Sequence, residues 1–141
     1  MKEIEWGSDG DGMLLGARAH DAVLISLEFV NRRRLLLTFR RVDGTEVKLS
    51  YEGVQEICLG QIWDDSIVSD IFIWSVSDVP ASQLVDVGWN ALFQGRASRQ
   101  YLEEDIKKII DRDRSQFLSV IGLVNGTSTA VVCKTLRVAE A

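Results

Sequence analysis

The sequence predicts an α+β fold that is mainly antiparallel β-sheet, a meander plus a C-terminal hairpin, packed with one principal helix. Three observations lead to this prediction. Apolar and polar residues alternate with a period of two over most of residues 22–52 and again over residues 117–135, as they do in strands that bury one face. Asp-Gly and Asn-Gly pairs separate such runs and are typical of hairpin turns. Residues 99–111 instead carry the helical period of an amphipathic segment.

The size and composition of the chain favour a single domain over residues 1–141. The chain has 141 residues, of which 46% are hydrophobic and 26% are charged, and these ordinary values exclude disorder as the main state. With 16 basic and 21 acidic residues the net charge is −5, which argues against a nucleic acid or an anionic membrane as partner and suits a basic protein. No apolar run approaches the roughly 20 residues of a membrane span. The charged N-terminus is unlike a secretory signal, so we expect a cytoplasmic protein.

The N-terminal segment, residues 6–16, is rich in glycine and aspartate, and we expect a loop there. Its glycine spacing misses the dinucleotide-binding fingerprint by one residue, and His20 stands where a calcium loop would close with glutamate. We therefore predict neither a cofactor nor a metal ion in this segment.

The meander should begin at Ala22 and place three strands within residues 22–52. In the first strand the residues expected to share the apolar face are Val23, Ile25, Leu27 and Phe29. Asp43-Gly44 separates the second strand from the third and predicts a type I′ turn, in which both central residues have a positive φ. One face of the meander should be buried and the other should face water.

Two further strands are predicted over residues 54–63 and 67–76, with Asp64-Asp65-Ser66 as the turn between them. The second of these runs is apolar on both faces, which favours a central strand that is covered on each side. Pro80 suits the first turn of a short helix that ends before Gly88.

The principal helix is expected from about Arg99 to Asp111, with Ser98 as its N-cap. Its apolar stripe consists of Leu102, Ile106, Ile109 and Ile110. A last hairpin follows the helix and has Asn125-Gly126 as its turn.

The cysteines and the histidine form no recognisable catalytic or metal-binding pattern. Cys58 and Cys133 fit no metal spacing, so two buried free thiols in a reducing cytosol are the preferred interpretation, with a disulfide between neighbouring strands as the alternative. His20 is the only histidine, and adjacent strand residues point to opposite faces, so we expect no dyad with Asp21. We interpret His20 as a hydrogen-bonding anchor at the start of a strand. We predict a protein that is not an enzyme and has no catalytic residue, no metal and no cofactor.

The predicted partner-binding surface is the acidic turn together with the strand that follows it. Asp64, Asp65 and Asp70 would supply negative charge, and Trp63 would supply an apolar anchor. The same carboxylates together with Asp78 could instead hold a divalent cation, but adjacent aspartates in a turn are commonly only solvated.

Arginines form a basic cluster on one hairpin of the meander, at residues 32–34 and 40–41. Such a cluster could contact phosphate groups. The flanking Phe29 and Phe39 are assigned to the buried face, so no stacking platform for bases is expected, and we predict no nucleic-acid partner.

Short motifs in the first half of the chain resemble those of known bacterial domains. His20-Asp21-Ala22 opens a strand, Tyr51-Glu52-Gly53-Val54 precedes the fourth strand, and an apolar run follows around Ile71-Phe72-Ile73. This order resembles small bacterial β-rich domains with a His-Asp-[small] strand-start motif, and several of their families are immunity proteins of polymorphic toxin systems. The resemblance covers about residues 6–76. It implies a non-enzymatic inhibitor that binds one cognate toxin, and a basic nuclease would suit the acidic chain.

Two other functions remain open from the sequence. One is a small-ligand-binding or enzymatic domain with a pocket between sheet and helix near His20. The other is a self-associating structural domain, a homo-oligomer in which an unpaired strand edge joins two copies.

Overall fold

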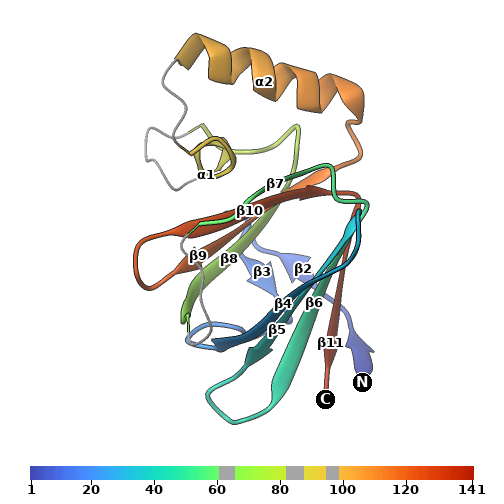
Figure 1. Cartoon of the computed structure of the whole chain (residues 1–141), viewed down its shortest axis with the longest axis vertical. Coiled ribbons are helices and arrows are strands. Elements are labelled where there is room, and N and C mark those ends of the chain that lie inside the picture. The colour runs from blue at the N-terminus through green and yellow to red at the C-terminus, as the bar shows by residue number, and fades with distance from the viewer. Residues whose placement is uncertain (61–65, 82–87, 95–98) are drawn as a thin grey trace.

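The computed structural model describes residues 1–60, 66–81, 88–94 and 99–141, with side chains in the last range from residue 103 onward. Two antiparallel sheets face each other, and the helices lie over the outer face of one of them (Figure 1). The predicted α+β fold dominated by antiparallel sheet is therefore confirmed.

The elements fall into two main sheets, a small hairpin and two helices. The five-stranded sheet has the order β1 (Lys2–Ile4), β11 (Thr135–Glu140), β6 (Glu46–Glu52), β5 (Arg34–Arg40) and β4 (Val23–Asn31). The four-stranded sheet has the order β7 (Glu56–Cys58), β10 (Ser128–Cys133), β9 (Phe117–Leu123) and β8 (Val68–Ser75). The hairpin consists of β2 (Gly7–Ser8) and β3 (Leu14–Leu15), and the helices are α1 (Trp89–Leu92) and α2 (Arg99–Arg112).

Both faces of the four-stranded sheet are buried, because each contributes to a different hydrophobic cluster. Ile71 and Ile73 of β8 belong to the core between the two sheets. The next residue, Trp74, points to the opposite face of the sheet. It belongs to the cluster under the helices, which includes Leu92 and Ile109. The alternation of side chains along a strand therefore serves two apolar cores at once.

β8 is an edge strand, so the prediction of a central strand is wrong. Segments from the N-terminal part of the chain cover its outer edge: Ile73 N–H donates to the Gly12 carbonyl at 2.8 Å, and Val68 N–H donates to the Ala22 carbonyl at 2.9 Å. The two-faced apolar pattern indicated correctly that both faces are covered. It carries no information about neighbours along the sheet, because sheet order depends on backbone pairing.

The predicted meander is confirmed as β4, β5 and β6, but the phase of its first strand is partly wrong. Leu27 pairs with Leu37 on the buried face as predicted, whereas Leu24, rather than Val23 or Ile25, pairs with Phe39 there. The assignment of Phe29 to the buried face is wrong, because this side chain near the strand end is 51% exposed. A bulge between Leu24 and Ser26 inserts one extra residue and reverses the alternation before it. Several apolar residues occur in succession here, so the sequence did not reveal the shift.

Both predicted hairpin turns occur, and they share a loop geometry that differs from type I′. Gly44 N–H donates to the Arg41 carbonyl at 2.9 Å, and Arg41 N–H donates to the Thr45 carbonyl at 2.8 Å. Gly44 has a φ of +86°, while Arg18 and Asp21 are the only described non-glycine residues with a positive φ, so the type I′ prediction is wrong. The turn at Asn125-Gly126 repeats this pattern of bonds. Both are three-residue loops closed by a glycine bulge.

The N-terminal segment contains strands in addition to the expected turn. β1 pairs with β11, and β2 and β3 flank the turn at residues 9–12. These strands form because Ile4 and Trp6 pack against the core between the sheets. The many glycines and aspartates of the segment suggest only a loop, so the sequence does not reveal these two apolar contacts.

The principal helix is confirmed as α2, and the side chain of Ile109 is only 3% exposed. The strand predicted over residues 54–63 is present in its described part as β7, which has three residues. The Asp64-Asp65 part of the next turn, the body of the short helix after Pro80 and the N-cap Ser98 lie outside the described residues.

Candidate binding site

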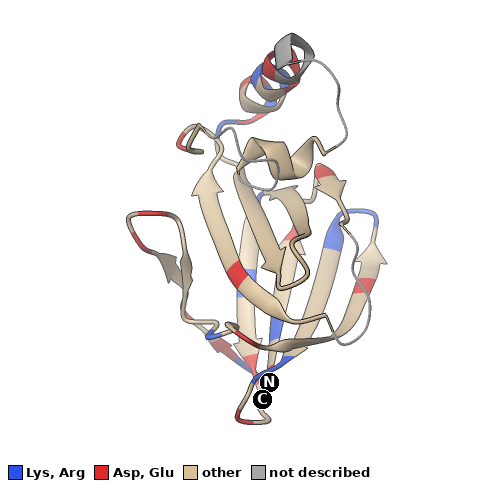
Figure 2. Cartoon of the chain, turned by 90° about the vertical axis from the view of Figure 1, so that its left-hand side faces the viewer, with Lys and Arg blue, Asp and Glu red and all other residues tan. Residues whose placement is uncertain are grey.

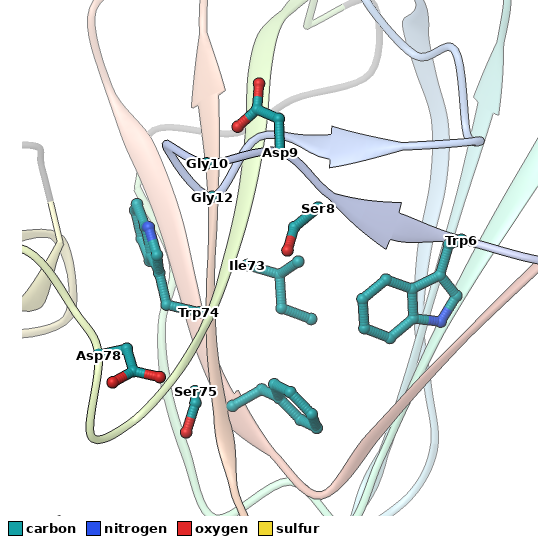
Figure 3. Close-up of a pocket in the computed structure, with 10 residues that line it drawn as sticks. Trp6, Ser8, Asp9, Gly10, Gly12, Ile73, Trp74, Ser75 and Asp78 are labelled. Atoms are coloured by element: carbon teal, nitrogen blue, oxygen red, sulfur yellow. The ribbon is translucent and has the colours of Figure 1, made fainter.

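A hollow of about 220 Å³ lies at the edge of β8, below the turn of the β2–β3 hairpin (Figure 3). We call it the tryptophan pocket. The described residues that line it are Trp6, Ser8, Asp9, Gly10, Gly12, Ile73, Trp74, Ser75, Asp78 and Phe117. They come from three segments of the chain that are distant in sequence and are brought together by the pairing of the N-terminal hairpin with β8.

The roof of the pocket is a turn that the Asp9 side chain holds in place. One carboxylate oxygen of Asp9 accepts hydrogen bonds from the backbone N–H groups of Asp11 and Met13, both at 2.9 Å. This is the local bonding for which aspartate is favoured in turns. The Asp9 carboxylate consequently points up into the turn and away from the hollow (Figure 3).

Gly12 allows the turn to lie directly against Trp74. Gly12 has a φ of +89°, and a Cβ atom at this position would stand 1.9 Å from Trp74 Nε1. Only glycine combines this backbone conformation with so close an approach. The contact fixes the tryptophan ring as one wall of the pocket.

Aromatic rings form the walls, and their polar N–H groups are already bonded inside the protein. Trp74 Nε1–H donates to the Asp11 carbonyl at 3.1 Å, and Trp6 Nε1–H donates to the Leu136 carbonyl at 2.7 Å. Trp6 and Phe117 meet edge to face with ring centroids 6.1 Å apart. The two indoles therefore contribute ring surface to the pocket, and neither N–H is available to a ligand.

The polar side chains that remain for a ligand are two hydroxyls and one carboxylate. The side chains of Ser8, Ser75 and Asp78 line the hollow and make no hydrogen bond to other described residues. Asp78 is exposed and follows β8 in a turn, where its N–H donates to the Ser75 carbonyl at 2.9 Å. None of the described lining residues is basic.

Acidic residues lie on the two loops that border the tryptophan pocket. Figure 2 shows acidic residues at the tip of the β2–β3 hairpin and in the turn that follows β8, on the same side of the chain. These acidic residues include Asp9 and Asp78, which line the same pocket. The described surroundings of the pocket are thus both aromatic and acidic.

The predicted partner-binding residues do not form this pocket. Trp63, Asp64 and Asp65 lie outside the described residues. Asp70 is half-buried near the start of β8, at a bulge where it pairs with Gly122, and it is not among the lining residues. Asp78, which the sequence suggested only as a member of an acidic set, is the carboxylate that reaches the pocket.

His20 acts as the predicted anchor but is not part of the pocket. Its Nδ1 lies 2.5 Å from the Ser69 carbonyl, and this hydrogen bond, reinforced by Asp21, raises the pKa of the imidazole. Asp21 has a φ of +62°, so the two residues are in a turn rather than a strand, and Nε2 lies 3.6 Å from the Asp21 carboxylate. The expectation that these side chains point apart is therefore wrong. The exposed pair joins the start of β4 to β8.

The two cysteines are free, and they point to opposite faces of the four-stranded sheet. Cys133 lies in the core between the sheets, whereas Cys58, on the neighbouring strand, packs against the cluster under the helices. Burial raises the pKa of the Cys133 thiol to about 12. The described residues contain no group of three or more His, Cys, Asp or Glu side chains that could hold a metal ion.

The basic residues of the meander do not form one cluster. Arg34 begins β5 and Arg40 ends it, so the two groups of arginines lie at opposite ends of this strand, about 20 Å apart. Arg41 is buried: its guanidinium donates to the Ala17 carbonyl at 2.7 Å and to the Glu140 carboxylate at 2.7 Å. It ties the N-terminal segment to β11. The expected single basic surface is therefore wrong.

Comparisons with known proteins gave no match to a protein-family model, to a curated protein or to a solved structure. The resemblance to immunity proteins therefore stays a prediction that rests on the motif residues alone. In the described part of the chain, neither helix has the length and apolar character needed to cross a membrane.

Proposed function

We propose that this protein is a non-enzymatic binding protein that holds a basic protein partner at the tryptophan pocket. The observation that supports this most directly is the chemistry of the pocket: aromatic ring surface combined with the Asp78 carboxylate, which has no partner among the described residues. Aromatic side chains are the commonest anchors at protein interfaces. The net charge of −5 adds a long-range attraction for a positively charged partner.

An immunity protein that neutralises a bacterial toxin is the specific form of this proposal that the motif resemblance suggests. The negative net charge and the acidic residues at the pocket would attract a basic toxin domain and speed its association. The partner would then cover the tryptophan pocket. Inhibition by direct binding requires no chemistry from the protein itself.

The experiment is to isolate the partner and measure its affinity for three forms of the protein. The tagged chain is purified from its native host, the co-purifying protein is identified, and the purified pair is studied by calorimetry. The forms are wild type, Asp78→Lys, and Glu28→Lys as a matched charge reversal. Glu28 is exposed and pairs with Leu36, so it lies on the outer face of the five-stranded sheet, away from the pocket.

We expect Asp78→Lys to weaken binding about tenfold, because it removes an attraction and adds a repulsion, each worth up to about 1 kcal/mol at an exposed site. Glu28→Lys should change the affinity less than twofold. Equal affinities of all three forms would show that the partner binds elsewhere. If no stoichiometric partner co-purifies from the native host, the binding function itself is refuted.

A further inference from the structure

We propose that the tryptophan pocket receives a single cationic side chain, an arginine or a lysine presented by a peptide segment of the partner. This inference rests on the proposed function and specifies which chemical group enters the site.

The volume of the pocket fits one side chain rather than a cofactor or a nucleotide. The hollow measures about 220 Å³. Sites for drug-sized ligands and cofactors usually measure about 300–1,000 Å³. A guanidinium or an ammonium group on an aliphatic stem is small enough for the observed space.

The walls favour a cation over an anion. The indole N–H groups of Trp6 and Trp74, the natural donors for an anionic ligand, already donate to carbonyls of the protein. The only charged side chain that remains available in the described lining is Asp78. The face of an aromatic ring attracts positive charge, and tryptophan does so most strongly. Because Gly12 and Phe72 pack on Trp74, the ring surface left for a cation is that of Trp6 and Phe117. Ring surface and carboxylate thus act in the same direction.

The same walls disfavour an uncharged apolar occupant. Such a group would strip water from the hydroxyls of Ser8 and Ser75 and from the Asp78 carboxylate without replacing the lost hydrogen bonds. A guanidinium carries five N–H donors and an ammonium carries three, so either can satisfy these acceptors.

The backbone at the pocket favours a peptide as the source of the cation. The N–H of Ile73 points away from β9, at the outer edge of β8, and donates to the Gly12 carbonyl. The N–H of Val76 points in the opposite direction and donates to the carbonyl of Gln116, just before β9. Because alternate residues of a strand direct their backbone groups to opposite edges, the N–H of Ser75 faces the pocket side. This donor suits the carbonyl of an extended peptide, as in strand-edge recognition.

Contacts within the protein hold the roof and one wall of the pocket in place without a ligand, which lowers the entropic cost of binding. The turn above it is fixed by the two hydrogen bonds to Asp9. Trp74 is held between the backbone of Gly12 and the ring of Phe72, which stacks on it with a centroid distance of 5.3 Å and an angle of 4°. A weakly binding probe should therefore report on the site without a conformational change.

The test is an NMR titration of the full chain with N-acetyl-arginine methylamide, using the tryptophan indole N–H signals as reporters. The matched neutral probe is the corresponding citrulline derivative, which has the same shape and no charge. Trp6 and Trp74 report on the pocket. Trp89 lies on α1 in the cluster under the helices and serves as the internal reference.

We expect the arginine probe to shift the Trp6 and Trp74 signals along a saturable curve with an affinity in the millimolar range, while Trp89 stays unchanged. Citrulline should bind at least about fivefold more weakly, and Asp78→Asn should weaken the arginine probe about two- to fivefold. Absence of a shift at Trp6 and Trp74, or equal binding of the two probes, would overturn the inference.

The two proposals fail in different ways. If the isolated partner binds and Asp78→Lys weakens it while the arginine probe gives no shift, the pocket is a partner surface but not a cation site. If the probe binds as expected and no partner is found, the cation site stands and the protein-binding function is refuted.

Discussion

Replacing Gly12 with alanine tests whether the packing of the hairpin turn on Trp74 is as tight as the structure indicates. The built Cβ atom would stand 1.9 Å from Trp74 Nε1, whereas real Cβ contacts essentially never fall below 3.0 Å. Something must therefore move by at least 1.1 Å, the difference between these distances. The nearest obstacle is a ring that is stacked on Phe72 and bonded to the Asp11 carbonyl, so it has little freedom to move.

The magnitude follows from three contributions. An alanine at a φ of +89° costs about 1–2 kcal/mol through its backbone conformation alone. Displacing Trp74 sacrifices its hydrogen bond to the Asp11 carbonyl, worth about 1 kcal/mol. Overpacking of the remaining contacts adds about 1–2 kcal/mol. We expect Gly12→Ala to lower the free energy of unfolding by about 3–5 kcal/mol, which for a chain of this size lowers Tm by roughly 10–17 °C.

Gly44→Ala separates the backbone cost from the steric cost. Gly44 has nearly the same φ, +86°, but a Cβ there would meet no atom within 4 Å. Urea unfolding followed by circular dichroism should therefore give a loss of about 1–2 kcal/mol for Gly44→Ala and a loss larger by about 2–3 kcal/mol for Gly12→Ala. Equal losses for the two variants would refute the argument that Trp74 requires glycine at position 12.

Three further predictions follow from described contacts. Arg41→Met should cost about 2–4 kcal/mol, because the Arg41 side chain is 4% exposed and its loss leaves the buried Ala17 carbonyl without its donor and Glu140 with only the exposed Arg18, at 3.7 Å. Arg137→Met, which breaks an exposed ion pair of 3.8 Å, should cost less than about 0.5 kcal/mol in the same unfolding assay. Hydrogen bonds from Ser115 lower the pKa of Asp113 to about 2. This stabilisation is present above the ordinary carboxyl pKa and is lost as the pH falls towards about 2, so the stability difference between wild type and Asp113→Ala should shrink when urea unfolding at about pH 5 is repeated at about pH 2.5. The buried Cys133 thiol, with its pKa of about 12, should not react with a thiol reagent at about pH 8 until the protein is unfolded, and fast reaction at this residue, located by mass spectrometry, would contradict its placement in the core.

The features that the sequence predicted correctly depend on local patterns. The alternation around β5, the Asn125-Gly126 turn and the helical stripe that contains Ile109 each lie within a few consecutive residues, and each was found. The bulge at Leu24 was missed, because neighbouring apolar residues make either phase of the strand equally acceptable. The N-terminal strands were missed, because glycine and aspartate dominate the segment and hide the role of Trp6 as an apolar anchor.

The pocket could not be predicted, because it depends on contacts between distant segments. Its aromatic walls come from three distant places: Trp6 lies between β1 and β2, Trp74 lies on β8, and Phe117 begins β9. No spacing in the sequence relates these positions to one another. One signal was present, the excess of glycine between positions 7 and 16, but on its own it predicts only a loop. Its meaning at Gly12 emerges only once the tryptophan ring is known to lie against it.

The position of the pocket follows from the way in which the edge of β8 is closed. An exposed edge strand invites unwanted pairing, and proteins usually cover it. Here Ala22 of the N-terminal segment bonds to Val68 of β8, and Gly12 bonds to Ile73. No backbone hydrogen bond from the described N-terminal segment reaches the edge at Ser75. The last part of the edge is thus left beside aromatic rings and the Asp78 carboxylate. An extended segment of the partner that paired with β8 at Ser75 would cover this last part of the edge. The residues that cover the rest of the edge also form the pocket, and they therefore determine which side chain of the partner can bind there.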